Sequence, residues 1–460
     1  MHAYMNLLAE LATYDRCHCG PEMERAYRKL VEYYRGARLL SFDTRNEINH
    51  WKLPPSWSCE VAELRDAQGN LIASRKRNNL EVFSYSPPVD KWVSHDELQD
   101  HLLSDPSRPD SIIFHFRNQY RHWAPQWGFS IPHRVRLGLS REDNYHVLIK
   151  SAFSFEHKLI QSDFLHQGKL DEQFLFMGHF DHPSQVNDGL AGCIAAYEVV
   201  RRLAGRETRY SYRAFASVEI VGSVAYLANE PEMGKITKEA MFLGFPGISA
   251  PLIYQQSFER KSMMDRIVRF LLGFDEQPAS GRIFGHREIA GNDENVFDSV
   301  GYEVPTGTLM RWPFPEYHTD GDTMAITSES RIEETISFVL KIIDIIENNK
   351  YLAATYSGVP SLANPDIDLY FSFGSVSGIA GAATEQASSY DNALSPQEMK
   401  YLQDRPNLFY ELMQNMLRMA DGKHTILDVA EKSRVPFGLV HMYALRLQGK
   451  GLVQLESESS

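Results

Sequence analysis

Four side chains that can bind a metal ion lie close together near the middle of the chain. His179, Asp181, His182 and Asp188 follow the apolar run "QFLFM" and precede "GLAGCIAAYEVVRRL", which has helical spacing. Imidazole and carboxylate groups are typical zinc ligands, and open α/β sheets bind ligands at the carboxyl ends of their strands. One such residue alone would be a cap or a solvated loop residue. Because four such residues lie close together, we favour a metal site at the end of a buried strand.

Three downstream segments add further polar groups. Glu219 ends the strand-like run "ASVEI" and could deprotonate a metal-bound water. Asp293 and Glu294 lie in a polar loop, where turn residues are an equally good interpretation. His318 lies in "RWPFPEYHTDGDT", a loop stiffened by prolines that could deliver a distant ligand to the metal.

Substrate-binding groups are harder to predict. Arg311 lies near His318 in the sequence and could bind a substrate carboxylate with its planar guanidinium. A structural role for this arginine is the favoured interpretation. Trp312, Phe314 and Tyr317 could line a pocket or could form the core of their own loop.

The pattern of elements predicts an α/β fold. From about residue 146, the strand-like runs "YHVLIKSAF", "QFLFMGHF", "YSYRAFASV" and "AMFLGF" alternate with expected helices at 190–204, 222–229 and 331–349. Such alternation is typical of a mixed or parallel sheet flanked by helices. From about residue 42 the chain instead has paired prolines and short alternating runs, which indicate a β-rich module.

These differences in sequence pattern predict that the chain has four parts. Residues 1–40 and 140–352 form the α/β domain, and 41–139 form an inserted β-rich domain. The Gly, Ser and Ala content of 353–394 indicates a linker or extended arm. The order helix, helix, helix, strand in 395–460 suggests a winged-helix domain.

The composition and charge of the chain limit the classes of function that we expect for it. The chain has 460 residues and a net charge of −13, which argues against a general binder of nucleic acid or of a membrane surface. The cysteines form no spaced framework, so a reducing compartment is the simpler inference. The N-terminus has no basic region typical of a signal peptide, and no apolar run approaches membrane-spanning length. We therefore expect a cytoplasmic protein with no membrane partner. The cysteines are Cys17, Cys19, Cys59 and Cys193.

Taken together, the motifs resemble the zinc aminopeptidase superfamily that includes bacterial leucyl aminopeptidases and glutaminyl cyclases. The stretch from His182 to Asp188 matches a His-Pro-Ser-x-x-Asn-Asp motif of one branch of aminopeptidase-like proteins, often encoded in polysaccharide or natural-product biosynthesis clusters. The same branch is matched by Glu219 with Gly222 and Ser223, by Gly291 to Glu294, and by Glu316 to Thr319. The resemblance implies a three-layer αβα zinc-peptidase domain of the phosphorylase/hydrolase-like type. It also implies an inserted β-rich domain and a C-terminal winged helix.

The resemblance also implies roles for single residues. Asp188 matches the carboxylate between the metal positions, His318 the last histidine ligand, and Glu219 the general base. His179 and Asp181 match the His-x-Asp pair of the wider superfamily, in which the aspartate orients the histidine. The closer branch stresses His182 instead, so both histidines stay open as ligands, with His182 favoured.

Two departures from the superfamily pattern point to a single metal ion. Two-metal aminopeptidases carry a second Glu directly after the base, where this chain has Ile220, and an Asp where it has "LGFPG". Because these two ligands are missing, we expect one zinc ion that is held by three protein ligands and keeps one coordination position open.

The leading prediction is thus a zinc-dependent aminopeptidase-like hydrolase that cleaves a peptide or small amide. One alternative is a catalytically degenerate binding or scaffold protein of the same fold. A DNA-binding regulator is less favoured, because residues 395–460 carry eight basic and eight acidic side chains, whereas DNA recognition normally needs excess positive charge. The inserted domain and the tail are both plausible surfaces for a homo-oligomer.

Overall fold

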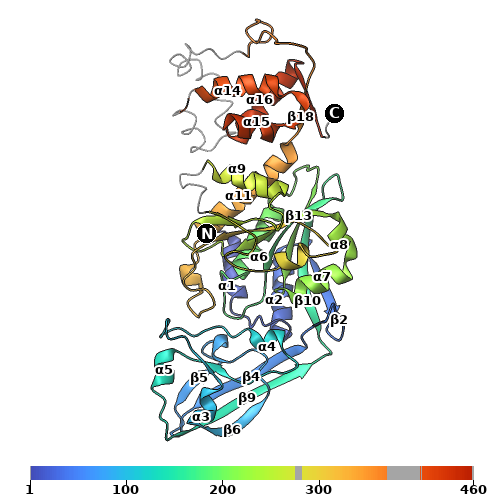
Figure 1. The fold of residues 1–460 in the computed structure, drawn as a ribbon. Coiled ribbons are helices and arrows are strands. Elements are labelled where there is room, and N and C mark those ends of the chain that lie inside the picture. Colours follow the sequence, from blue (N-terminus) through green and yellow to red (C-terminus); the bar gives the residue numbers. More distant parts are fainter. Residues whose placement is uncertain (1, 275–281, 370–404, 406, 458–460) are drawn as a thin grey trace. The chain divides into compact units, whose positions relative to one another are not determined.

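The structure is a computed structural model, shown as a ribbon in Figure 1, and it describes residues 2–274, 282–369, 405 and 407–457. The chain divides into two compact units. The first comprises Met1–Asp265 and Arg282–Val339, and the second comprises Arg266–Gly281 and Leu340–Ser460. Helices α9 (Met263–Leu272) and α11 (Glu329–Asn348) each continue from one unit into the other.

An eight-stranded mixed sheet forms the centre of the first unit, in the order β1-β10-β12-β11-β13-β16-β14-β15. Strand β11 is parallel to both β12 and β13, and β13 is parallel to β16. Every residue of β11 is buried, as expected for an apolar run covered on both faces. The strands are β1 (Arg38–Asp43), β10 (Lys158–His166), β11 (Gln173–His179), β12 (Ser211–Ser217), β13 (Thr237–Gly244), β14 (Leu252–Gln255), β15 (Ile283–Phe284) and β16 (Thr306–Arg311).

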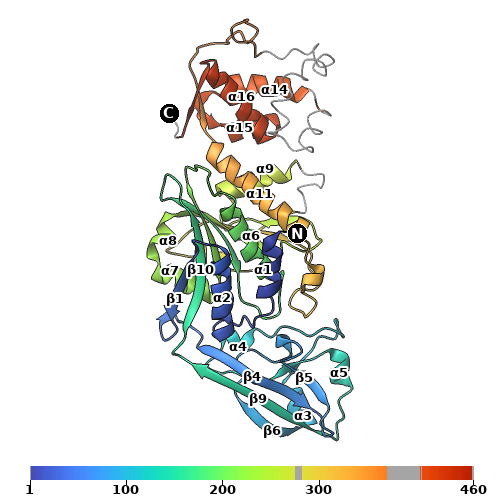
Figure 2. The same ribbon diagram turned by 180° about the vertical axis from the view of Figure 1, so that it is seen from behind.

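Helices cover both faces of this sheet (Figures 1 and 2). Helices α1 (Ala3–Leu11), α2 (Pro21–Tyr33) and α6 (Leu190–Arg201) pack on one face, and α6 is buried from Leu190 to Val200. The other face carries α7 (Val221–Asn229), α8 (Pro231–Ile236) and the short α10 (Glu294–Phe297). The predicted α/β class with helices on both sides of a sheet is confirmed.

One predicted strand belongs to a different sheet. "YHVLIKSAF" was expected to begin the α/β domain, but β9 (Asn144–Ser154) pairs with β4 and β6 in a separate four-stranded sheet, ordered β5-β4-β9-β6. Its alternating pattern identifies a strand but not its partners, so the prediction was wrong about the sheet. After the inserted module, the chain returns to the central sheet through β10, a strand that was not predicted and that pairs antiparallel with β1.

We call residues 44–157, between β1 and β10, the inserted module. It has its own core, which includes Trp57, Tyr85, Phe129, Tyr145 and Val147. Its elements are β2 (Glu47–Ile48), β3 (Trp51–Lys52), β4 (Ser56–Arg65), β5 (Leu71–Ser74), η1 (Asn79–Glu81), β6 (Val89–Ser94), α3 (His95–Gln99), β7 (Leu102–Leu103), α4 (Arg117–Tyr120), β8 (Phe129–Ser130), α5 (His133–Leu137) and β9.

Besides the ends of α9 and α11, the described part of the second unit contains α14, α15, α16 and an antiparallel sheet ordered β18-β17-β19. Helix α15 begins with a capping box between Thr425 and Asp428. Strand β17 overlaps the start of the predicted linker, and residues 370–394 of that linker lie outside the described residues. The elements are β17 (Tyr351–Ala354), α14 (Asn407–Arg418), β18 (Asp421–Thr425), α15 (Ile426–Ser433), α16 (Phe437–Gly449) and β19 (Val453–Glu456).

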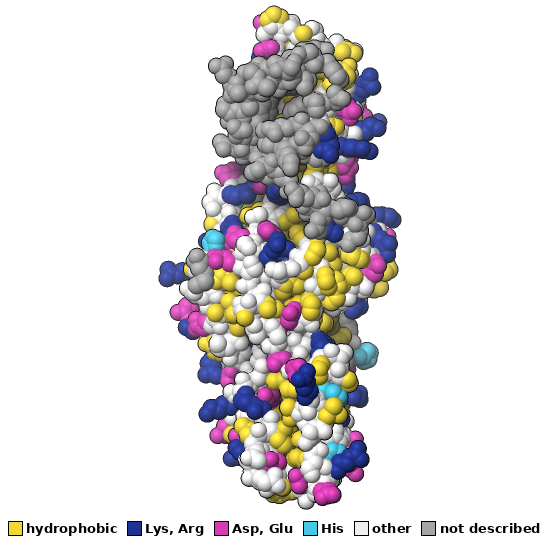
Figure 3. Space-filling model, turned by 90° about the vertical axis from the view of Figure 1, so that its left-hand side faces the viewer, with side chains coloured by type: hydrophobic (Ala, Val, Ile, Leu, Met, Phe, Trp, Pro, Cys, Tyr) yellow, Lys and Arg dark blue, Asp and Glu magenta, His cyan; other side chains and the backbone are white. Residues whose placement is uncertain are grey.

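All four cysteines are free and buried. Within the described ranges, no helix has both the length and the apolar character required to cross a bilayer. On the face drawn in Figure 3, Lys and Arg side chains are interspersed with Asp and Glu over the described part.

Candidate metal centre

The central sheet brings the predicted site residues to one edge. His179 is the last residue of β11 and lies in register with Ser217, the last residue of the parallel strand β12. Asp188 follows in the loop before α6, Glu219 follows β12, and His318 follows β16, the next parallel strand beyond β13. Because these strands run in the same direction, their carboxyl ends meet at one edge and their loops converge there.

Three of these side chains direct polar atoms at one point. His318 Nε2 lies 3.0 Å from Asp188 Oδ2, and His182 Nδ1 lies 3.5 Å from the same oxygen. His179 Nε2 instead lies 3.5 Å from the other oxygen, Asp188 Oδ1. The carboxylate of Asp188 therefore faces His182 and His318 with one oxygen and His179 with the other.

These atoms converge without bonding to one another. His182 Nδ1, Asp188 Oδ2 and His318 Nε2 are buried and have no hydrogen-bond partner of acceptable geometry. They lie within 4.8 Å of one another. Because buried polar atoms are almost always satisfied, such a convergence fits a cation, and two imidazole nitrogens with one carboxylate oxygen are a zinc donor set.

The electrostatics also favour a positive charge at this point. Burial opposes ionisation of both His182 and Asp188. Even so, the carboxylates of Asp181 and Asp188 raise the pKa of His182 well above its ordinary value. His182 in turn holds the pKa of Asp188 well below its usual range. Burial lowers the pKa of His179, and the neighbouring His182 lowers it further.

Asp181 lies behind the metal-facing atoms. Its Oδ2 lies 3.8 Å from His182 Nε2 and 3.1 Å from Nε2 of His18, and its Oδ1 accepts a 2.9 Å hydrogen bond from the backbone N–H of Glu219. A carboxylate behind a histidine ligand fixes the ring orientation. His18 was not predicted as part of the site, because it lies about 160 residues away in "DRCHCG" and carries no local motif.

Two buried charged residues shape the loop that carries His182 and Asp188. The guanidinium of Arg16 donates to the carbonyl oxygens of Phe180, Asp181 and Gln185. Asp322 accepts hydrogen bonds from the backbone N–H groups of residues 186, 187 and 188 at 3.1, 2.9 and 2.9 Å. Neither residue was predicted, although Asp322 stands only four positions after His318.

Replacing Asp322 with asparagine should weaken zinc binding by about 10- to 100-fold, the usual effect of losing an outer partner. An amide has a single acceptor oxygen, so at least one N–H of the 186–188 loop would face an NH₂ group and Asp188 would shift. The measurement is zinc affinity by competition with a chromophoric chelator. Asp320→Asn is the matched control, because Asp320 lies in the same loop but accepts from Ile112 N. Equal zinc affinity in Asp322→Asn and wild type would contradict this role.

Glu219 lies beside the cluster with its side chain 17% exposed. Its Oε2 is 2.5 Å from the hydroxyl of Tyr120 and 3.4 Å from His182 Nε2. The next residue, Ile220, has a φ of 59°, which is unfavourable for a β-branched side chain. Its N–H donates to Asp293 Oδ1 at 3.0 Å, so Asp293 holds the turn that follows Glu219.

Asp293 and Glu294 thus lie outside the group that faces the metal position. The hydroxyl of Ser223 also donates to Asp293 Oδ1, and burial raises the pKa of Asp293 to about 8. Glu294 accepts from the backbone N–H of Asn292 and lies 3.3 Å from Arg287, and burial raises its pKa to about 7.

Arg311 has the structural role that the sequence favoured, and it is not placed to act as the substrate clamp that was the other possibility. It is 2% exposed. Its guanidinium donates to the carbonyl oxygens of Pro246, Ala250 and Arg331 and to the carboxylate of Glu334. With these donors engaged, the group has no fork free for a carboxylate.

The aromatic residues of the same loop, Trp312, Phe314 and Tyr317, belong to or pack against one apolar cluster, which is the loop-core role of the two predicted. Phe314 is buried in a cluster with Phe245, and Trp312 packs against that cluster. Tyr317 stacks on His318 with ring centroids 3.9 Å apart and 18° between the planes. Burial raises the pKa of Tyr317, and the nearby Asp188 and Glu219 raise it further. Tyr317 therefore supports His318 directly.

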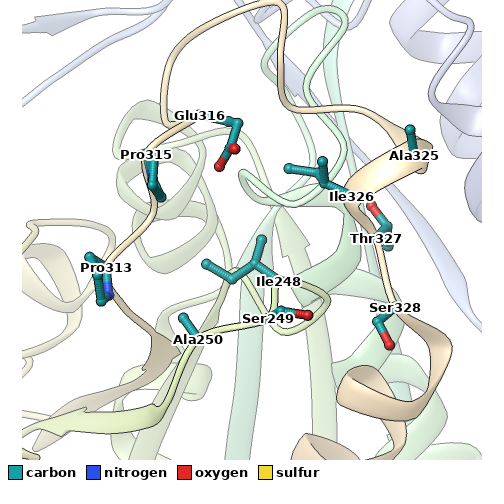
Figure 4. Close-up of a pocket in the computed structure, with 10 residues that line it drawn as sticks. All are labelled: Ile248, Ser249, Ala250, Pro313, Pro315, Glu316, Ala325, Ile326, Thr327 and Ser328. Atoms are coloured by element: carbon teal, nitrogen blue, oxygen red, sulfur yellow. The ribbon is translucent and has the colours of Figure 1, made fainter.

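A cavity of about 500 Å³ opens beside the loop that leads to His318 (Figure 4). Glu316 projects toward the enclosed space, where it faces Ile248, Ile326 and the hydroxyl of Thr327. The full lining is Ile248, Ser249, Ala250, Pro313, Pro315, Glu316, Ala325, Ile326, Thr327 and Ser328.

The inserted module contacts the His318 loop directly. The N–H of Phe114 donates to the carbonyl oxygen of His318 at 2.9 Å, and Ile113 forms an antiparallel bridge with Thr319. The ring of Phe114 meets those of His318 and His182 at 5.4 and 4.9 Å. This contact between the inserted module and the site was not predicted from the sequence.

The central sheet and its helices have the fold of the zinc aminopeptidases. A zinc aminopeptidase from Bacillus subtilis superposes with a TM-score of 0.52 at 13% identity, covering 74% of this chain and 93% of that one. A Clostridium acetobutylicum crystal structure named as a peptidase superposes with a TM-score of 0.81 at 24% identity, covering 98% and 95%. The predicted resemblance to the superfamily is confirmed at the level of the fold.

The chain belongs to the family described as a domain of unknown function, DUF4910, whose model matches residues 5–349. A Clostridium acetobutylicum protein is 27% identical over 453 residues, which cover 98% of this chain and 95% of that protein. The name of that relative assigns it to polysaccharide biosynthesis and gives it an aminopeptidase-like domain.

Proposed function

We propose that the protein is a zinc-dependent hydrolase that cleaves a peptide or small amide bond with a single zinc ion. The observation that carries this proposal is the convergence of His182 Nδ1, Asp188 Oδ2 and His318 Nε2, which lack hydrogen-bond partners, at the edge of an aminopeptidase-like sheet. Three protein ligands leave a fourth position open, as hydrolytic zinc sites require.

Each residue around the metal position would have its own role in the reaction. When bound, zinc would polarise the substrate carbonyl and lower the pKa of a water molecule. His182, Asp188 and His318 would hold the ion, with His179 against the second oxygen of Asp188. Asp181 would keep the ring of His182 in place from behind. Glu219 would take the proton of the water and pass it to the leaving amine.

The test is amide hydrolysis by the purified full-length chain, with and without a chelator. We expect about one zinc ion per chain and turnover of some members of a panel of aminoacyl anilides, dipeptides and small amides, lost with chelator and restored by zinc. Because the relative's name refers to polysaccharide biosynthesis, the panel should include N-acyl amino sugars. A zinc-loaded, folded protein that hydrolyses none of them would favour a degenerate binding or scaffold protein of the same fold.

A further inference from the structure

Three consecutive residues of helix α4 in the inserted module each form hydrogen bonds with a different part of the chain. Asn118 donates its amide to the carbonyl oxygens of Ser84 and Gln126, inside the module. Gln119 accepts a 3.1 Å hydrogen bond from the backbone N–H of His18. Tyr120 directs its hydroxyl at Glu219. Helix α4, though only four residues long, is therefore anchored on both sides before it presents Tyr120 to the central sheet.

The hydroxyl of Tyr120 donates a hydrogen bond to the carboxylate of Glu219. The hydroxyl oxygen lies 2.5 Å from Glu219 Oε2, within the range for a hydroxyl that donates to a carboxylate. Burial raises the pKa of Tyr120 well above its ordinary value, and Glu219 raises it further, so the phenol keeps its proton and donates it. The edge contact with the ring of His18, at 4.9 Å between centroids, fixes the plane of Tyr120.

This contact engages one oxygen of Glu219 and leaves the other available. Among the described residues, the polar contacts of the carboxylate, with Tyr120 and His182, are both made by Oε2. The backbone of Glu219 is held separately, through its N–H by Asp181 and through the following turn by Asp293. The Tyr120 hydroxyl, together with His182, therefore restrains the rotation of the carboxylate itself.

We propose that Tyr120 is a positioning residue for Glu219, so that the inserted module completes the active site of the hydrolase. The inference rests on the proposed function. A general base must hold one oxygen within reach of the proton that it accepts, and a carboxylate free to rotate would spend less time in that orientation. The hydroxyl of Tyr120 removes that freedom from outside the α/β domain.

The test compares Tyr120→Phe with wild type and with Tyr145→Phe, using the best substrate of the amide panel. Tyr145→Phe removes a hydroxyl of the same module that donates to Ser140 O at 2.9 Å. For Tyr120→Phe we expect kcat to fall by about 10- to 100-fold, the worth of one hydrogen bond to a charged group. KM and zinc content should stay within about twofold of wild type. Tyr145→Phe should keep its kcat.

Urea unfolding of the zinc-loaded protein adds a readout that does not depend on activity. The shift in midpoint caused by Tyr120→Phe should shrink in a Glu219→Ala background, because the hydroxyl has then already lost its partner. Equal shifts in both backgrounds, or an unchanged kcat in Tyr120→Phe, would overturn the role of Tyr120 while leaving the hydrolase intact. A wild-type protein inactive on the whole panel would overturn the proposed function, and this inference with it.

Discussion

Replacing Glu219 with glutamine should leave zinc in place and lower kcat by about 10²- to 10⁴-fold, the range typical of a general base. The amide has nearly the same shape and can still accept the hydrogen bond from Tyr120, but it cannot take a proton from water. Zinc content by elemental analysis and kcat on the best substrate of the panel are the two measurements.

This experiment distinguishes two possible roles of Glu219, as a general base or as a residue that orients His182. Its Oε2 lies 3.4 Å from His182 Nε2, so the carboxylate could instead serve to orient that ligand. In that case Glu219→Gln would weaken zinc binding by about 10- to 100-fold, and excess zinc would restore turnover. Glu294→Gln is the matched control, since Glu294 is a buried glutamate that bonds to Asn292 N and lies outside the cluster. It should retain both zinc and activity.

Replacing Asp188 with asparagine should weaken zinc binding by more than about 100-fold, a larger effect than the loss of an outer partner, and abolish turnover. Asp188 is the residue on which the cluster depends, because its two oxygens face His182, His318 and His179. An asparagine offers one neutral oxygen, and its NH₂ group would repel a cation from the other side. Zinc affinity and amide hydrolysis are measured on the same preparation.

A matched control separates this loss from general damage to the fold. Asp265 is also a buried aspartate of the first unit, where it accepts hydrogen bonds from the hydroxyls of Tyr254 and Ser257. Asp265→Asn should lower the free energy of unfolding by about 1–3 kcal/mol, as expected for a buried group left partly unsatisfied, and should still bind zinc. Full zinc occupancy in Asp188→Asn would rule out Asp188 as a ligand.

Much of the site could be predicted because most of its polar residues lie in short segments of the sequence. His179, His182 and Asp188 are neighbours in the sequence, and the strand before them and the helix after them are marked by their apolar spacing. Glu219 and His318 each follow a strand of the same sheet. The parallel arrangement then brings these loop residues together without any further information.

The prediction failed where long-range contacts decide the outcome. The alternating pattern of β9 marks a strand equally well in either sheet, and only its pairing with β4 and β6 assigns it to the inserted module. The structural role was favoured for Arg311, but its partners, the carbonyl oxygens of Pro246, Ala250 and Arg331, could not be named from the sequence. Nothing local to Asp322 or Tyr120 shows that one holds the 186–188 loop and the other bonds Glu219.

The sequence by itself determined which groups can hold a metal, on which strand ends they stand, and that the sheet is covered on both faces. Only the tertiary structure decided that His182 and His318 share one oxygen of Asp188 while His179 faces the other. It also decided that the inserted module reaches the site. The reason is physical: residue type and apolar spacing act over a few positions, whereas burial and hydrogen-bond partners depend on which distant segments pack together.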